Sequence, residues 1–309
     1  MRRIKKGEGE KTPGIFNPKL VGAGAVAGSA LWAALVGSFL WRSTHPKRRP
    51  VRLPSDSFNL PIENVSFSSR GGMVLKGWFL PSKEARGTVI FCHGYPSSRG
   101  TMLPFARQLN DIGFHSLLFD FRAMGESGGD VSTIGYLEIE DLLGAVDYLS
   151  ARSETSGSKI GVYGFSMGGA VAIMAAAQDD RISAVVTHGA YANLERAIYK
   201  RGKLMLGPLG AIPAASLCAI SQHHLGFSPS EVSPLAVIGQ IAPRPILLFH
   251  GQWDQVCDLK DGADLYQAAK HPKRLFVLPR SWHSVIAPSE RHEYNAMLKD
   301  FFRNHLCQE

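Results

Sequence analysis

The chain has 309 residues, 45% apolar and 19% charged, and a formal net charge of +8. This composition excludes a wholly disordered chain, and the length suits one large α/β domain or two ordinary ones. Four cysteines without a CxxC pair exclude a disulfide scaffold and disfavour a zinc ribbon or a thioredoxin-type site. The first 52 residues hold 11 basic and 2 acidic residues, which leaves 23 basic and 24 acidic residues (net −1) elsewhere. The positive charge therefore does not predict a nucleic-acid-binding domain.

A charge-free segment near the N-terminus predicts a membrane anchor. A basic tail (residues 1–19) precedes 22 residues without a charge, Leu20–Trp41, and a basic linker (42–58) follows. As a helix at ~1.5 Å per residue the segment would span roughly 33 Å, enough for a ~30 Å hydrocarbon core. Trp41 and Arg42 would lie at the interface and among the headgroups. We expect a single-pass membrane protein, and basic residues at both ends of the segment leave its orientation open.

Three other interpretations fit this segment less well. A cleaved signal peptide has a shorter apolar region and a small-residue cleavage site, whereas this segment ends in Phe-Leu-Trp-Arg. A buried core helix would rarely lack charge on every side. The GxGxxA match at 22–27 would need a preceding strand and an acidic residue ~20 positions later. Position 42 is Arg, so we discard a dinucleotide-binding loop.

From about residue 59 to the C-terminus the pattern is that of one α/β domain. Two short strands around Arg70-Gly71-Gly72 predict a hairpin. Short apolar runs then alternate with helical periodicity, which is typical of a parallel sheet covered on both faces. The expected strands of that sheet are 88–92, 116–119, 159–163, 182–186, 246–249 and 275–278. The helix expected over 136–149 carries Glu140, Asp141 and Asp147, which we interpret as a solvated face.

A long stretch, about 193–240, interrupts this alternation between two of the strands. It is rich in Leu, Ala and Pro, and Lys200, Arg201 and Lys203 lie near its start. A long insertion beside the carboxyl edge of a sheet is usually a lid or a functional loop. We expect a lid.

The strongest chemical signal is Gly164-Phe165-Ser166-Met167-Gly168. It follows an apolar strand and precedes an Ala-rich helix, which is the context that a GxSxG nucleophile requires. On such a strand-to-helix turn the Ser166 hydroxyl is exposed, and the helix N-terminus directs free N–H groups at the site. Ser166 is therefore the predicted nucleophile.

A serine nucleophile needs a base, and the base needs an acid that orients it. For this motif the chain order is Ser, acid, His. Asp254 lies in the loop after the strand at 246–249, and His283 in the loop after the strand at 275–278. Parallel strands end at the same edge of a sheet, so we expect both loops to meet Ser166. The fallback acids are Asp258 and Asp261, and His188 and His250 are interpreted as structural.

Two backbone N–H groups are the expected oxyanion hole. One belongs to Met167, the residue after the nucleophile, and the other to Tyr95 in the loop His93-Gly94-Tyr95-Pro96. We interpret His93 as a residue that pins this loop. The charges of the loop at 120–127 are likewise interpreted as structural.

These pieces together resemble the α/β-hydrolase superfamily. The matching segments are HGYPSS at 93–98, DFRAMGESGG at 120–129, GFSMGG at 164–169, HGQWDQV at 250–256 and SWH at 281–283. The resemblance covers the chain from about Leu60 onward and implies a mostly parallel eight-stranded sheet with a Ser166–Asp254–His283 triad. Within the superfamily, the chain resembles membrane-anchored lipid and acyl-thioester hydrolases and also the serine aminopeptidase-like branch. The 193–240 insertion matches no substrate-specific pattern.

The predicted function is hydrolysis of carboxylic esters or thioesters of acyl or lipid type through an acyl-enzyme. We expect no metal and no organic cofactor, since His223-His224 has no Cys or acid at ligand spacing. A serine aminopeptidase-like peptidase or a soluble-ester carboxylesterase would use the same residues. A membrane-tethered binding module with an idle hydrolase fold is the non-enzyme alternative. The oligomeric state is left open.

Overall fold

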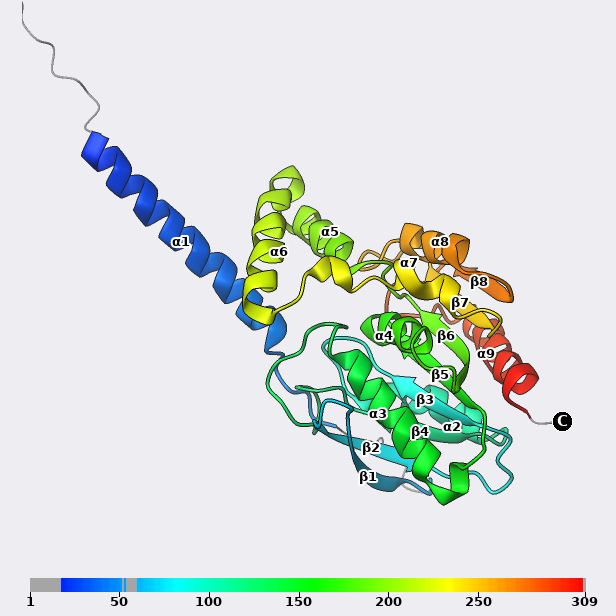
Figure 1. Cartoon of the computed structure of the whole chain (residues 1–309). Coiled ribbons are helices and arrows are strands. Elements are labelled where there is room, and N and C mark those ends of the chain that lie inside the picture. The colour runs from blue at the N-terminus through cyan, green and yellow to red at the C-terminus, as the bar shows by residue number, and fades with distance from the viewer. Residues whose placement is uncertain (1–17, 52, 54–59, 308–309) are drawn as a thin grey trace, which may run out of the picture.

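The computed structural model describes residues 18–51, 53 and 60–307, with side chains from Gly28 onward. Residues 1–17 of the predicted basic tail, and residues 52 and 54–58 of the predicted linker, lie outside the described residues. The rest forms a long N-terminal helix and an α/β domain with a helical insertion (Figure 1).

An eight-stranded sheet organises the domain, in the order β1-β2-β4-β3-β5-β6-β7-β8. The first strands, β1 and β2, form an antiparallel hairpin, β2 is also antiparallel to β4, and the remaining pairs are parallel. This confirms the mostly parallel eight-stranded sheet expected from the sequence. The strands are β1 (Glu63–Ser68), β2 (Val74–Leu80), β3 (Thr88–Cys92), β4 (His115–Phe119), β5 (Ile160–Phe165), β6 (Ile182–His188), β7 (Ile246–Gly251) and β8 (Lys273–Leu278).

Helices cover both faces of the sheet, as the continuous apolar strands require. Within β3, Ile90 and Cys92 face one core cluster, and Val89 and Phe91 face the other. The first cluster is closed by α3 (Glu138–Ala151), α4 (Met167–Ala176) and α8 (Leu259–Ala268). The second is closed by α2 (Leu103–Asn110) and α9 (Arg291–Leu306). Figure 1 shows α3 and α4 side by side over the sheet.

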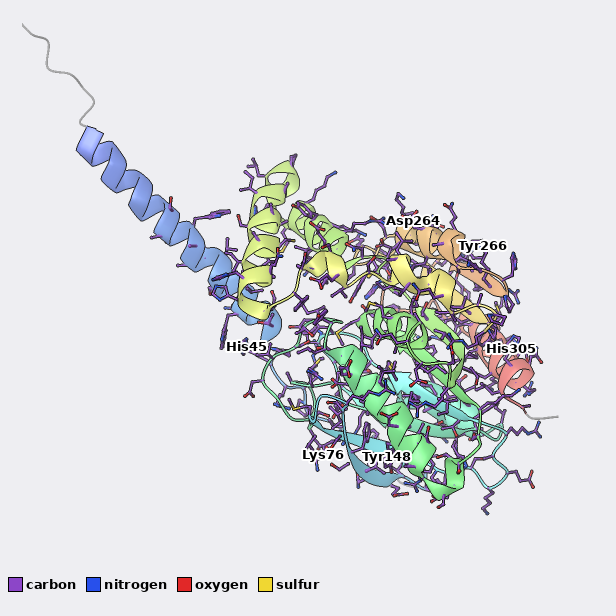
Figure 2. All side chains as sticks on the ribbon, viewed as in Figure 1. His45, Lys76, Tyr148, Asp264, Tyr266 and His305 are labelled. Carbon is purple, nitrogen blue, oxygen red and sulfur yellow. The ribbon has the colours of Figure 1, made fainter. Side chains whose placement is uncertain are left out.

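Two helical parts lie outside this sandwich. The N-terminal helix α1 runs from Pro18 to Thr44, slightly beyond the charge-free segment at both ends, and His45 stacks on Trp41 just past its end (Figure 2). The insertion between β6 and β7 contains α5 (Leu194–Leu206), the short η4 (Gly207–Gly210), α6 (Ala211–Leu225) and the single turn α7 (Pro234–Val237). Asn193 caps α5 by accepting a hydrogen bond from the Arg196 N–H at 3.1 Å.

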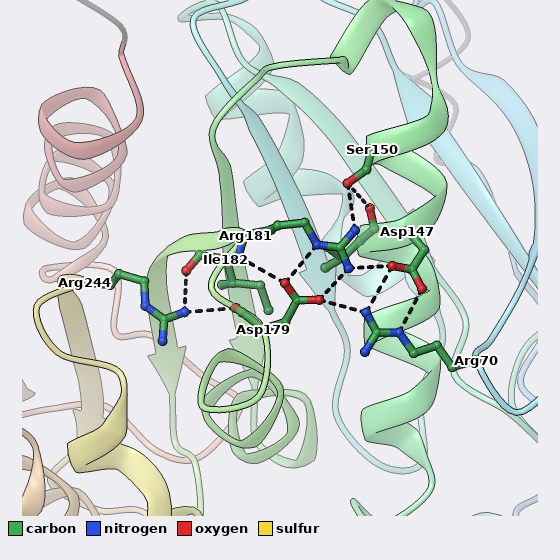
Figure 3. A network of polar contacts seen from close by, with 8 residues as sticks. Arg70, Asp147, Ser150, Asp179, Arg181, Ile182 and Arg244 are labelled. Atoms are coloured by element: carbon green, nitrogen blue, oxygen red, sulfur yellow. Dashed lines mark hydrogen bonds and ion pairs between the residues drawn. The ribbon is translucent and has the colours of Figure 1, made fainter.

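A polar network joins the hairpin to the helical layer (Figure 3). Arg70, in the β1–β2 turn, donates to Asp147 of α3 at 2.8 Å and to Asp179 at 2.9 Å. Arg181 binds both carboxylates from the turn before β6. The hydrogen bonds of Arg181 lower the pKa of Asp179 to about 2, against the effect of burial. This network ties three segments that are far apart in the sequence.

The expectation for Asp141 was wrong. Its carboxylate is fully buried rather than solvated, and it pairs with the Arg122 guanidinium at 2.6 Å. Burial raises the pKa of Asp141 to about 6, although Arg122 opposes that rise. Because Arg122 belongs to the loop after β4, the pair fixes this loop against α3. Helical periodicity could not show this, because the burying partner comes from another element.

Candidate active site

Ser166 lies on the sharp turn between β5 and α4. Its backbone has φ 53° and ψ −118°, a conformation that side chains rarely adopt and that marks a strained turn. The flanking glycines make the turn possible. A Cβ on Gly164 would lie 2.3 Å from the carbonyl oxygen of Gly168, and one on Gly168 would lie 2.3 Å from that of Cys92. Strand and helix therefore approach more closely than any other residue would allow.

The structure brings the three predicted side chains into one hydrogen-bonded line. His283 Nε2 lies 2.9 Å from Ser166 Oγ, and His283 Nδ1 lies 2.6 Å from Asp254 Oδ2. The residues come from the loops after β5, β7 and β8, which all leave the carboxyl edge of the sheet. Neither fallback acid takes the place of Asp254. Asp258 and Asp261 instead form the capping box at the start of α8.

The environment of Asp254 keeps this carboxylate ionised and oriented. Its Oδ1 accepts hydrogen bonds from the Val256 and Cys257 N–H groups, each at 2.8 Å, and Oδ2 is left for His283. Burial disfavours the charged form, but the hydrogen bond and charge of His283 outweigh it, so the pKa of Asp254 is lowered. An ionised Asp254 makes Nδ1 of His283 the protonated nitrogen. Nε2 is then free to accept the Ser166 proton.

The two expected oxyanion donors belong to segments that adjoin the nucleophile turn. Met167 is the first residue of α4, so its N–H has no acceptor within the helix. Tyr95 follows Gly94, whose added Cβ would lie 2.8 Å from Phe165 and 3.2 Å from the Cβ of Ser166. The loop after β3 is thus packed directly against the nucleophile turn, and this places the Tyr95 backbone beside Ser166.

The remaining histidines of this region have structural partners. His93 accepts from the Phe121 N–H at 3.1 Å, and its Nδ1 lies 2.8 Å from the Gly94 carbonyl oxygen, so it links the loops after β3 and β4. His188 lies 3.3 Å from the Tyr294 hydroxyl. Burial lowers the pKa of His188 to about 3 and also lowers the pKa of His93. Neither side chain is suited to accept a proton from Ser166 near neutral pH.

Two features of the site were missed in the sequence. Gly189, just after β6, has φ +62°, and a Cβ there would lie 3.2 Å from both Asp254 Oδ2 and His283 Nδ1. Glu290 binds the Ser281 hydroxyl and accepts from the Arg280 N–H at 2.8 Å, which shapes the loop that carries His283. A glycine directly after a buried strand was the available signal for the first. The second had none, because Glu290 lies outside every motif.

The described residues contain no group of three or more His, Cys, Asp and Glu side chains that could hold a metal ion. His223 and His224 pack ring against ring near the end of α6, with centroids 5.3 Å apart.

Comparison with known proteins agrees with this architecture. Residues 87–236 match the family model described as the alpha/beta hydrolase fold. The chain is 30% identical over 253 residues to the uncharacterized protein YfhR of Escherichia coli K12, covering 79% of this chain and 81% of that one. It is 28% identical over 251 residues to the uncharacterized protein YqkD of Bacillus subtilis, covering 79% and 80%. This chain belongs to the α/β-hydrolase family.

Solved structures show the same fold. The esterase Pf2001 of Pyrococcus furiosus superposes with a TM-score of 0.71 at 26% identity, covering 86% of this chain and 99% of that one. A dienelactone hydrolase of Anabaena variabilis superposes with a TM-score of 0.58 at 23% identity, covering 79% and 99%, and shows the fold alone. The family and its esterase neighbours support a hydrolase.

Proposed function

We propose that this protein is a membrane-anchored serine hydrolase that cleaves carboxylic ester or thioester bonds of acyl or lipid-type substrates. The observation that carries the reaction type is the hydrogen-bonded line from Asp254 through His283 to Ser166, with distances of 2.6 Å and 2.9 Å. A carboxylate, an imidazole and a hydroxyl in this order are the parts of a serine nucleophile system.

The reaction follows from this geometry in two halves. His283 Nε2 takes the proton of Ser166 Oγ, which attacks the substrate carbonyl carbon, and the Met167 and Tyr95 N–H groups stabilise the resulting oxyanion. When the tetrahedral intermediate collapses, His283 protonates the leaving alcohol or thiol and the acyl group stays on Ser166. His283 then deprotonates a water molecule, which attacks the acyl carbon, and Ser166 regains its proton as the acid leaves.

The membrane part of the proposal rests on α1. Its charge-free segment Leu20–Trp41 is long enough to span a bilayer, and several large apolar side chains along its described part are exposed. These are Leu31, Trp32, Leu35, Phe39 and Trp41. In water such a row would be unfavourable, whereas lipid would cover it. An anchored enzyme meets acyl esters or thioesters at the bilayer, and this supports the substrate class.

Fluorophosphonate labelling tests the mechanism. The purified wild type is expected to label covalently, and Ser166→Ala is expected not to label. Ser156→Ala, at an exposed serine on the opposite side of the domain, is the control and is expected to label like the wild type. An unlabelled wild type would favour the idle binding module. Equal labelling of Ser166→Ala would place the nucleophile elsewhere.

A substrate panel tests the bond that is cleaved and the place where it is cleaved. Acyl esters, acyl thioesters and aminopeptidase substrates are compared with and without detergent micelles. The proposal expects hydrolysis of esters or thioesters that rises with micellar substrate. Cleavage of peptides alone would favour the aminopeptidase-like alternative, and equal activity on soluble short esters would remove the argument for interfacial substrates.

A further inference from the structure

The end of α1 is bound to the α/β domain beside the loop after β3 that carries Tyr95. The Tyr95 hydroxyl donates a hydrogen bond to the Ser43 carbonyl oxygen at 2.5 Å. Arg48 donates to three carbonyl oxygens of the loop 125–129, at distances of 2.6 to 3.2 Å. The direction of α1 relative to the domain, which Figure 1 shows, is therefore set by specific contacts. If α1 spans a bilayer, the position of that bilayer relative to the domain is set as well.

Helix α6 packs along α1 in the same chain direction. Trp32 Nε1 donates to Ser216 Oγ at 3.2 Å, and further along both helices Val36 and Leu40 pack against Leu217. These contacts all involve the C-terminal half of α1, and they follow the same order along both helices. In Figure 1 the turn between α5 and α6 points to the same side of the domain as the beginning of α1.

The α5–α6 segment is a helical hairpin with an apolar end. By length and composition alone the continuous stretch Leu194–Leu225 could cross a membrane, but the structure folds it back at η4. The turn packs on α5 through glycine, since a Cβ on Gly210 of η4 would lie 2.0 Å from the carbonyl oxygen of Gly202 of α5. The large apolar side chains around this turn, here called the hairpin tip, are all exposed. They are Leu204, Met205, Leu206, Leu209 and Ile212.

Charge is distributed as expected for a helical element that enters a lipid surface. The chain has no charged residue from Leu204 to Gln222. Arg201 and Lys203 lie within about one turn of the tip on α5, and both are exposed. An apolar end bordered by basic side chains suits an acyl-chain region beneath anionic headgroups.

The base of the hairpin is tied to the loop that supplies the catalytic acid. Lys200 Nζ lies 2.9 Å from Asp258, and Arg196 binds Asp261 at 3.3 Å and Asp264 at 2.9 Å. These acids follow Asp254 directly, in the loop and first turns of α8. The position of the hairpin is therefore coupled to the edge of the active site.

We infer that the hairpin tip inserts into the same phospholipid bilayer as α1, with Arg201 and Lys203 at the level of anionic headgroups. This second membrane contact rests on the anchoring by α1 proposed above. It holds the carboxyl edge of the sheet, where Ser166 lies, against the lipid surface. The substrates that reach the site are then acyl chains that leave the adjoining leaflet.

Depth-dependent quenching tests this insertion. The full-length chain, with Cys218 and Cys307 changed to Ser, is labelled with the environment-sensitive dye NBD at Leu209→Cys and placed in phosphatidylcholine–phosphatidylglycerol vesicles. The matched control carries the dye at Ser156→Cys, beyond the amino edge of the sheet. Fluorophosphonate labelling of each sample shows that the domain is folded.

The inference expects a blue-shifted NBD emission at position 209 that doxyl groups on the lipid acyl chains quench, and neither effect at position 156. An unquenched position 209 in protein that floats with the vesicles and resists carbonate extraction would overturn the insertion and leave the anchor intact. A protein partner covering the tip would give that same result. Protein that does not float at all would overturn both the insertion and the anchoring.

The basic side chains give a second readout. In Lys203→Gln the ratio of inserted to free tip is expected to fall about fivefold in vesicles that contain phosphatidylglycerol. In phosphatidylcholine alone this variant should match the wild type. Lys270→Gln, which removes an exposed cation far from the tip, is the matched control. An equal effect of both variants would overturn the headgroup contact.

Discussion

Gly189 offers a sharp test of how the fold positions the catalytic pair. It lies directly after β6 with φ +62°, and an added Cβ would lie 3.2 Å from both Asp254 Oδ2 and His283 Nδ1. A contact this short requires the neighbours to move by a few tenths of an ångström. The hydrogen bond between Asp254 and His283, now 2.6 Å long, would have to adjust.

The expected magnitude for Gly189→Ala has two parts. A left-handed backbone costs an alanine about 1–2 kcal/mol, which lowers the free energy of unfolding by that amount. A misplacement of ~1 Å can reduce the rate about 100-fold, so a few tenths of an ångström should reduce kcat roughly fivefold to tenfold. KM should change little, because Gly189 contacts the catalytic side chains rather than the acyl chain.

Gly72 provides the matched control for this variant. It has φ +79° in the β1–β2 turn, and an added Cβ there meets nothing within 4 Å. Gly72→Ala should therefore lose similar stability in urea unfolding and keep its kcat for ester hydrolysis. If Gly189→Ala kept full kcat, or if both variants lost it equally, the contact with Asp254 and His283 would not be the cause.

Four further predictions concern charged groups. Asp254→Asn should lower kcat about 10⁴-fold, because His283 loses its orienting partner, and a loss under tenfold in steady-state ester hydrolysis would contradict this role. Arg122→Met should lower the free energy of urea unfolding by about 3–5 kcal/mol, since it leaves Asp141 buried without a counter-ion, and an unchanged midpoint would contradict this. The pKa of Asp141 is raised to about 6, so its protonated form contributes stability that is complete below about pH 4 and is lost as the pH rises through 6. The free energy of unfolding should fall over this range by at most about 3 kcal/mol, and Asp141→Asn should lack this pH dependence. The pKa of Asp179 is lowered to about 2, so its contribution to stability is present above about pH 4 and disappears toward pH 2. In thermal unfolding, Asp179→Asn should therefore lower the free energy of unfolding by about 1 kcal/mol at pH 7 and leave it unchanged at pH 2. The figure at pH 7 is small because the arginine partners of Asp179 are half-exposed.

Local patterns were sufficient for the sheet and for the nucleophile turn. The strands at 88–92, 116–119 and 246–249 are short apolar runs, and such runs need cover on both faces wherever they occur. The GFSMG motif lies between a strand and a helix whose backbones approach closely. Only glycine fits at Gly164 and Gly168, as the short contacts of an added Cβ at each position show. The convergence of Ser166, Asp254 and His283 follows from strand ends that share one edge.

Residues that act through partners distant in the sequence could not be predicted in this way. The burial of Asp141 depends on Arg122 from another loop, and the role of Gly189 depends on two loops that arrive much later in the chain. The helix pattern at 136–149 indicated which residues are polar but carried no information about which neighbours would cover them. A charge pattern indicates that a residue prefers water or a charged partner, and only the assembled fold shows which of the two it has.

The sequence by itself therefore determined the fold family, the residues proposed to carry the reaction and the place of a membrane-length apolar segment, because each is written in residues that are close together or regularly spaced. Only the tertiary structure decided how that segment meets the enzyme. The bond from Tyr95 to Ser43 and the packing of α6 on α1 join parts of the chain that are separated by 50 to more than 180 residues. Such contacts arise from the path of the backbone through the whole domain, and no local pattern encodes them.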